Sequence, residues 1–161
     1  MSNSINTNTE LMRRAIALSR EKMKAGFGGP FGALIVTEGK IIAEGYNQVT
    51  SGNDPTAHAE VVAIREACQQ LGTFNLEGYS IFTTCEPCPM CLSAIYWARL
   101  DQIIYANNRK DAAAIGFDDA LIYHEVTLPM ESRQIPSQQL LHDEALKVFS
   151  EWMSKDDRMQ Y

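Results

Sequence analysis

Two short clusters hold the side chains of this sequence that could do chemistry. One is the triplet 58–60, His-Ala-Glu, and the other is the pentapeptide 87–91, Pro-Cys-Pro-Met-Cys. An imidazole and two thiolates supply three ligands for a tetrahedral zinc ion, and a site with three protein ligands keeps its fourth position for water. We therefore predict that His58, Cys88 and Cys91 bind one Zn²⁺ per subunit, together with a water or hydroxide.

Glu60 is not needed as a metal ligand, so it can act on that water. A carboxylate beside the water can take its proton as a general base and return it as a general acid. Two thiolates and a neutral imidazole bring the formal charge of the zinc site to zero, which keeps a hydroxide feasible near neutral pH. The predicted chemistry is hydrolytic deamination of an amidine-like carbon, with Glu60 as the catalytic proton shuttle.

Cys88 and Cys91 differ by three positions, so they share one face of a helix that is predicted from about Pro87 to Arg99. Pro87 puts both thiols in the first turn, where unpaired N–H groups and the helix dipole favour thiolates. A structural zinc site would add Cys85 as a fourth ligand, but Cys85 ends a predicted strand, and we expect it to point elsewhere. A thioredoxin-like redox pair would leave the triplet 58–60 without a purpose.

His58 and Glu60 differ by two positions and would lie about 200° apart on a regular helix. They can converge only if His58 stands at the very start of its helix. Asp54 and Pro55 have the residue types of a helix cap and first turn, so we predict a helix that begins there and runs to about Leu71.

Strand-like and helix-like segments alternate along the chain, which predicts an α/β layered sheet. Thr7 and Glu10 predict a capping box that opens a helix ending at Gly26. The other predicted elements are a hairpin of 31–37 and 40–45, strands at 79–84 and 102–106, a short helix followed by loops within 107–136, and an amphipathic helix at about 140–152. A strand before each zinc-binding helix would deliver both clusters to one sheet edge, the usual ligand edge of α/β folds.

The 161 residues, 45% of them hydrophobic, predict a single domain over 1–161. The net charge of −6 argues against a general binder of nucleic-acid backbones. No apolar run approaches a membrane span, and residues 1–9 lack a signal-peptide pattern. Three of the four cysteines lie within seven residues, a metal spacing, so we expect a cytoplasmic protein with no membrane or nucleic-acid partner. Ordinary core or surface roles are expected for Cys68, His124 and His142.

Five stretches extend the pattern beyond the zinc ligands. The H-x-E and P-C-x-x-C clusters are shared by zinc-dependent deaminases of free bases, nucleosides and tRNA, so they indicate the reaction and leave the substrate open. Over about residue 10 to Tyr161 the chain resembles the bacterial guanine deaminases of the cytidine-deaminase-like superfamily. The stretches that carry this resemblance are 29–33 (GPFGA), 53–60 (NDPTAHAE), 85–91 (CEPCPMC), 94–99 (AIYWAR) and 116–119 (GFDD).

This resemblance implies a three-layer α/β/α fold with a five-stranded mixed sheet. It implies a homodimer in which the C-terminal helix and tail, 138–161, cross to the partner subunit and close its pocket. It also implies conversion of guanine to xanthine and ammonia in purine salvage or catabolism, on a small-molecule purine.

Several residues acquire a second interpretation from the resemblance. By propensity alone Phe31 would be core, Asn47 a turn residue, Asp119 a solvated carboxylate and Tyr161 a frayed end, while Trp97 fits core or pocket. As parts of the family pattern, Phe31 stacks on the base, Asn47 reads its edge, and Asp119 accepts an N–H or holds the departing amine. The substrate-binding set is completed by Trp97, Tyr161 and the backbone N–H of Ala59.

Other functions stay open at this point. Guanosine, ammeline and cytosine share an amidine-like edge with guanine, and the sequence does not show whether the pocket leaves room for ribose. Deamination of tRNA adenosine needs a positive surface, and the tail segment 155–158 offers two positive and two negative charges. A non-catalytic module stabilised by zinc would give Glu60 no role.

Overall fold

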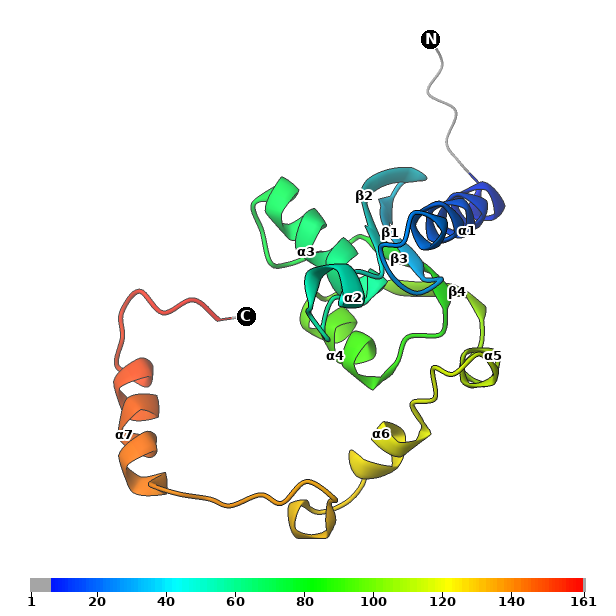
Figure 1. Ribbon diagram of the computed structural model, residues 1–161. Coiled ribbons are helices and arrows are strands. Elements are labelled where there is room, and N and C mark those ends of the chain that lie inside the picture. The colour runs from blue at the N-terminus through cyan, green and yellow to red at the C-terminus, as the bar shows by residue number, and fades with distance from the viewer. Residues whose placement is uncertain (1–6, 161) are drawn as a thin grey trace. The chain divides into compact units, whose positions relative to one another are not determined.

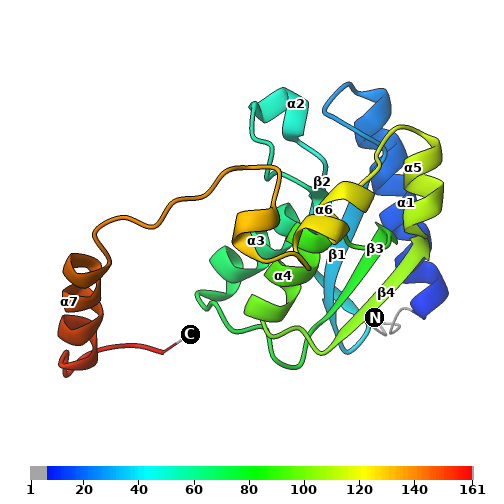
Figure 2. The same ribbon diagram turned by 90° about the horizontal axis from the view of Figure 1, so that it is seen from below.

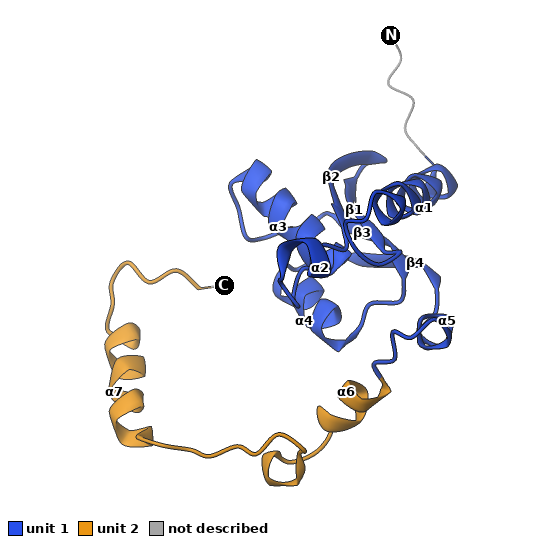
Figure 3. Cartoon of the chain, viewed as in Figure 1, with its two compact units in different colours: residues 1–119 blue, residues 120–161 orange. Residues whose placement is uncertain are grey.

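The computed structural model describes residues 7–160. These form two compact units, which meet between Asp119 and Ala120 in the sequence (Figure 3). The single domain predicted over 1–161 and the crossing of 138–161 to a partner stay predictions. The zinc-ligand clusters both lie in the first unit.

Helix α1, Asn8–Lys24, begins as its sequence predicts. Thr7 is the N-cap, its hydroxyl accepts from the backbone N–H of Glu10, and the Glu10 carboxylate accepts from the Thr7 backbone N–H at 2.7 Å. The helix ends at the C-cap Ala25, and Gly26 follows with φ of +79°, a left-handed conformation that glycine adopts without strain. The predicted capping box and glycine stop are confirmed.

The sheet of the first unit has the strands β1 (Gly32–Thr37), β2 (Lys40–Tyr46), β3 (Ser80–Cys85) and β4 (Gln102–Asn107), in the order β2-β1-β3-β4 (Figure 1). The predicted hairpin of β1 and β2 is confirmed, and both of its turn residues, Glu38 and Gly39, have positive φ, as tight hairpin turns require.

The number of strands corrects the prediction, since residues 7–160 form four strands and not five. The chain leaves β4 directly into helix α5, Arg109–Ala114, because Asn108 caps it and Asp111 completes a capping box. The next element, α6, is also helical, over Ala120–Glu125. After β4 the local capping signals therefore favour helix over a further strand.

The directions of the strands determine which strand ends lie at the same edge of the sheet. β1 is antiparallel to both β2 and β3, and β3 is parallel to β4, so the sheet is mixed, as predicted. β2, β3 and β4 consequently run the same way, and their carboxyl ends share one edge with the start of β1. The segments that follow these ends, and the segment before β1, carry the predicted site residues.

Helices cover both faces of this sheet (Figures 1 and 2). One buried cluster joins α1 to the side of the sheet that presents Leu34, Val36 and Phe82. The other joins the opposite side, with Ile35 and Ile81, to helices α3 (Ala59–Leu71) and α4 (Pro89–Trp97). The alternation of neighbouring residues between the two clusters is the period of two expected for strands buried on both faces. The three-layer arrangement is therefore present in the first unit.

The second unit contains α6, a 3-10 turn at Met130–Ser132 and helix α7, His142–Met153. Helix α7 matches the predicted amphipathic helix at about 140–152. Its apolar residues Val148, Phe149 and Met153 are exposed in the single chain. Among the described residues, no helix is both long enough and apolar enough to cross a membrane.

Candidate active site

The first ligand cluster lies where α3 begins. His58 is the N-cap, with an extended backbone at φ −68° and ψ 153°, and Glu60 is the second residue of the helix. The predicted start at Asp54 and Pro55 is wrong by about four residues. Asp54 instead closes a turn, in which its Oδ1 accepts from the backbone N–H and the hydroxyl of Thr56. The condition that His58 must stand at the very start of its helix is met, which lets His58 and Glu60 face the same site.

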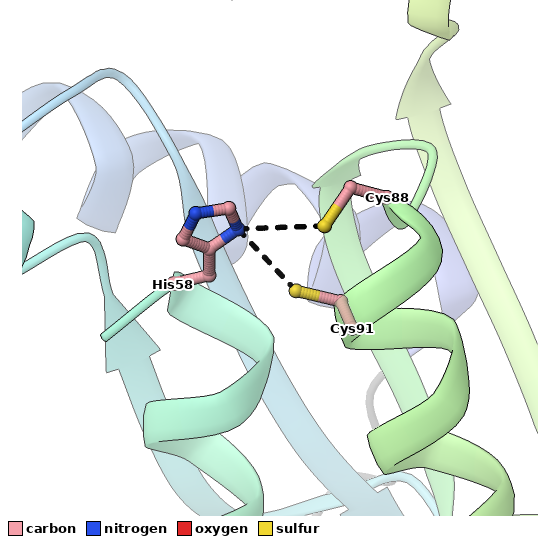
Figure 4. Close-up of side chains that lie close together, drawn as sticks. All are labelled: His58, Cys88 and Cys91. Atoms are coloured by element: carbon pink, nitrogen blue, oxygen red, sulfur yellow. Dashed lines mark hydrogen bonds between the residues drawn. The ribbon is translucent and has the colours of Figure 1, made fainter. Parts of the chain in front are cut away.

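The second ligand cluster lies where α4 begins. Cys88 is the N-cap, Pro89 opens the helix, and Cys91 lies on its first turn. The N-terminal ends of α3 and α4 lie side by side, with the three ligand side chains between them (Figure 4). Two helix N-termini place partial positive charge beside the thiols, which favours their ionised, metal-binding form.

The distances between the ligand atoms fit a tetrahedral zinc ion. His58 Nδ1 lies 3.6 Å from Cys88 Sγ and 3.5 Å from Cys91 Sγ, and all three atoms lie within 4.8 Å of one another. Zn–N bonds of about 2.0–2.1 Å and Zn–S bonds of about 2.3 Å, set at tetrahedral angles, separate nitrogen from sulfur by about 3.6 Å. The three side chains are thus arranged as three corners around a position that zinc would occupy.

Hydrogen bonds join His58 to the two cysteines. Hydrogen bonds from Cys91 and His58 lower the pKa of the Cys88 thiol to about 4, in spite of its partial burial. The hydrogen bond to the Cys88 thiolate raises the pKa of Cys91, and the same thiolate raises the pKa of His58. Zinc would replace these shared protons with one divalent charge.

Glu60 lies beside the ligands, deep in the protein. Its Oε2 accepts from Cys91 Sγ at 3.4 Å, and its Oε1 accepts from the hydroxyl of Thr83 at 3.1 Å. Burial raises the pKa of the Glu60 carboxyl. A carboxyl whose pKa is raised, and which a neighbouring hydroxyl holds in place, is suited to accepting and returning a proton. Sequence reasoning missed Thr83, because the role of this residue depends on how β3 packs against α3.

Cys85 takes no part in the ligand group. Its Sγ is directed to the backbone oxygen of Asn108 at 3.8 Å, and burial raises the pKa of its thiol to about 11. Within residues 7–160 the metal-binding group consists of His58, Cys88 and Cys91 alone. The expectation that Cys85 points elsewhere is confirmed, and a closed four-ligand site is not formed.

Asn47 follows β2 and braces the glycine turn before β1. Its Oδ1 accepts from the backbone N–H groups of Gly29 at 3.2 Å and Val49 at 3.3 Å, which fixes the plane of the carboxamide. A Cβ at Gly28 would lie 2.4 Å from that oxygen, so only glycine allows the turn to come so near. Short helix α2, Val49–Gly52, which the sequence pattern did not indicate, continues from Asn47.

Phe31 stands at the same sheet edge, just before β1. It packs partly against the core cluster under α3, and its ring meets Phe117 edge to face, with centroids 4.9 Å apart and planes at 89°. Both expected roles of Phe31, core and pocket wall, are compatible with this half-buried position. Phe117 belongs to the stretch 116–119, but the sequence analysis assigned it no role of its own.

Asp119 ends the first unit, and burial together with the Cys88 thiolate raises the pKa of its carboxyl. The role of Asp119 toward the substrate stays a prediction. Ala59 is fully buried, and its backbone N–H is at the first helical position, where it has no acceptor within α3.

Trp97 is the last residue of α4 and is 66% exposed, about 9 Å along the helix axis from Cys91. The structure does not place it against the zinc ligands, and its pocket role stays a prediction. Tyr161 lies outside the described residues.

Comparison with known proteins agrees with this geometry. Residues 5–107 match the family model for the cytidine and deoxycytidylate deaminase zinc-binding region. The chain belongs to this deaminase family. His58, Cys88 and Cys91 lie within the matched zinc-binding region and are placed to bind a metal ion, so the predicted zinc cofactor is confirmed.

Among relatives of this deaminase, a guanine deaminase of Bacillus subtilis is 52% identical over 93% of the chain and 96% of the relative. A crystal structure of guanine deaminase from B. subtilis superposes with a TM-score of 0.93 at 50% identity, over 96% of this chain and 99% of that one. A tRNA-specific adenosine deaminase of Aquifex aeolicus is 35% identical over 78% of the chain and 81% of the relative.

Gly45 is a further residue of the deaminase site that sequence reasoning missed. A Cβ there would lie 2.2 Å from the Ala59 carbonyl oxygen, 2.4 Å from the Ala63 nitrogen and 2.8 Å from the Ala63 Cβ. The first turn of α3, which carries Glu60, therefore rests directly on the β2 backbone. A single glycine inside a strand was the one available signal, since it often marks such a close approach.

Proposed function

We propose that this protein is a zinc-dependent guanine deaminase that converts guanine and water to xanthine and ammonia. The observation that carries the reaction is the buried Glu60 carboxylate, 3.4 Å from Cys91 Sγ, beside three side chains spaced as zinc ligands. The substrate is supported by similarity to a guanine deaminase over nearly the full length of both chains. When bound to His58, Cys88 and Cys91, zinc supplies a water of lowered pKa as the nucleophile.

Glu60 moves the protons in this proposal. Its carboxylate takes one proton from the attacking water and delivers it to the ring nitrogen. It then carries the second proton, from the hydroxyl on the attacked carbon, to the amine, which leaves as ammonia while the carbonyl forms. Thr83 donates to Oε1 and so directs Oε2 toward the ligand side. The raised pKa of Glu60 keeps the protonated form accessible at the stage when the carboxyl acts as an acid.

The remaining contacts choose the substrate. A purine has a flat apolar body and polar edges, so Phe31 stacks on the ring while Asn47 and the Ala59 N–H bind edge atoms. The Asn47 oxygen is occupied by two backbone donors, which leaves its amide nitrogen to donate to a base oxygen. Asp119 accepts an N–H of the base or holds the departing amine.

The direct test of Glu60 is Glu60→Gln, which keeps shape and hydrogen bonding and removes the titrating group. We expect normal folding and zinc content, with kcat lower by about 10²–10⁴-fold. The matched control is Glu66→Gln, on the exposed side of the same helix, where the carboxylate bonds only Gln70 in the structure. Normal ammonia release from Glu60→Gln would remove the proposed proton shuttle.

The substrate is tested by measuring ammonia release from guanine, guanosine, ammeline, cytosine and tRNA with the zinc-loaded enzyme. We expect guanine to give the highest kcat/KM. The 35% identity to a tRNA adenosine deaminase makes tRNA the main rival substrate. The net charge of −6 argues against it, because a tRNA backbone requires clustered positive charge. Faster turnover of tRNA than of guanine would refute the assignment.

We further propose a homodimer, in a reducing cytoplasm, whose segment 138–161 crosses to the partner, with Tyr161 closing the partner's pocket. The exposed apolar residues of α7 support a contact of this helix with a partner subunit. The four cysteines form no disulfide, which supports a reducing compartment. Two inactive variants test the crossing, Glu60→Gln and a chain lacking residues 154–161. In a mixed heterodimer, the truncated chain supplies Glu60 and the Glu60→Gln chain supplies the tail that closes the same site. One of the two sites is then intact, and random pairing makes about half of the dimers mixed, so about one quarter of wild-type activity should return. An inactive mixture that does form heterodimers would exclude the crossing.

A further inference from the structure

The segment 108–119, which joins β4 to Asp119, is fastened at its beginning by Glu86. This residue lies in the turn between β3 and Cys88, and its Oε2 accepts from the backbone N–H of Arg109 at 3.0 Å. The backbone N–H of Glu86 also donates to the carbonyl oxygen of Asn107 at 2.8 Å. Glu86 thereby ties the turn that presents a zinc ligand to the first residue of α5.

The end of α5 has a defined geometry as well. The N–H of Gly116 donates to Ala113 O and the N–H of Phe117 donates to Ala112 O, both at 3.0 Å. These two bonds, with φ of +93° at Gly116, form a Schellman motif. The motif reverses the chain after α5 and aims the side chain of Phe117 in a fixed direction.

Phe117 meets a different part of the chain in that direction. Its ring lies edge to face with Phe31 at 4.9 Å, and a Cβ on Gly29 would lie 3.1 Å from its Cζ. An apolar residue at this position of a Schellman motif commonly packs on its own helix. Here it also connects the end of α5 to the proposed aromatic wall of the pocket.

Asp119 follows Phe117 by two residues, so the two anchors fix where its carboxylate lies. Helix α5 has only six residues, and a helix of this length is not stable by itself. Its place therefore depends on contacts at its ends, and both the Glu86 bond and the Phe117 ring connect the segment 108–119 to other parts of the chain.

We infer that Glu86 and Phe117 are positioning residues, which hold the segment 108–119 at its two ends so that Asp119 stays directed at the substrate. The inference rests on the proposed function of Asp119. Phe117 has a second effect that Glu86 lacks, since it also fixes the ring of Phe31. Loss of Phe117 should therefore raise KM and lower kcat, whereas loss of Glu86 should lower kcat alone.

Steady-state kinetics of zinc-loaded variants, with the best base substrate of the wild-type enzyme, test this inference. We expect Glu86→Ala and Phe117→Ala each to lower kcat by about 10–100-fold, the effect of a displacement near 1 Å. Glu86→Gln, which keeps an acceptor oxygen, and Phe117→Tyr, which keeps the ring, should restore most of it. In an Asp119→Asn background neither alanine substitution should lower kcat further. Multiplicative losses in these double variants would overturn the inference while leaving the deaminase assignment intact.

Amide hydrogen exchange of the full zinc-loaded chain gives a readout that needs no turnover. Both alanine variants should exchange faster at residues 112–117, because the Schellman amides lose their supports. The controls are Glu66→Ala and Phe74→Ala, a hydrogen-bonded exposed glutamate and a phenylalanine 43% exposed, compared with 46% for Phe117. Unchanged exchange in the two test variants would overturn the inference. An inactive wild type with faster exchange in both variants would instead refute only the proposed reaction.

Discussion

Gly45→Ala should disturb the active site by displacing helix α3, which packs on β2 at this position. The new Cβ would lie 2.2 Å from the Ala59 carbonyl oxygen and 2.8 Å from the Ala63 Cβ. Ordinary contacts at these atoms are roughly 1 Å longer, so α3 must move away from β2 by about that amount. The atoms that the new Cβ would meet are backbone or Cβ atoms, which no rotamer change can move aside.

The displaced part of α3 is its first turn, which bears His58 and Glu60. Overpacking of this kind lowers the free energy of unfolding by about 1–3 kcal/mol, a fall in the melting midpoint of about 2–12 °C for a chain of this size. A shift near 1 Å at the reacting groups can lower kcat by about 10²-fold. Zinc content should fall as well, because His58 moves relative to the two cysteines.

Gly52→Ala is the matched control. Gly52 lies between the same strand and helix, at the end of α2, and a Cβ there meets nothing within 4 Å. Circular dichroism melts, bound zinc and ammonia release are measured on both variants. If Gly45→Ala melted, bound zinc and turned over like Gly52→Ala, the close approach of β2 and α3 would not be what positions Glu60.

Three further predictions concern the zinc site. Cys88→Ala should lose bound zinc, whereas Cys85→Ser should retain it, as metal analysis of the purified variants would show; equal zinc in both would contradict the ligand set. Zinc uptake at pH 7 should release about one to two protons, because Cys91 and His58 have raised pKa values and both must give up protons to bind. Affinity should accordingly fall as pH falls, and calorimetry in buffers of different ionisation enthalpy counts the protons; no dependence on buffer would refute this. Thr83→Val should lower kcat about 10-fold with zinc unchanged, through loss of the hydrogen bond that orients the carboxylate.

The sequence predicted correctly those structures that depend on a few consecutive residues. The capping box of Thr7 and Glu10 and the turn at Glu38 and Gly39 each depend on a few consecutive residues, and both are confirmed. The predicted start of α3 was wrong because it also relied on a local signal. Asp54 has the residue type of a helix cap, but its carboxylate closes a turn four residues too early.

The zinc ligands could be predicted because their spacing is itself the signal. His58 and Cys88 are N-caps of two helices that follow strands of the same direction, so the topology brings them together once the pattern is recognised. Thr83 and Gly45 could not be predicted in this way. Each acts across elements distant in the sequence, and threonine and glycine occur in strands for many other reasons.

In the proposed function, substrate choice depends on contacts with the base, which are the contacts that residue types and spacing alone predicted least well. The proposed base contacts come from the glycine turn before β1, the end of β2 and the loop after α5, which adjoin one another only because four strand ends share an edge. A change in one of these loops can alter which base is bound while His58, Cys88, Cys91 and Glu60 remain in place. This separation fits the similarity of the chain to relatives named for guanine and for tRNA adenosine. It also implies that substitutions at Asn47 or Phe117 should change the ratio of kcat/KM among bases more than they change zinc content.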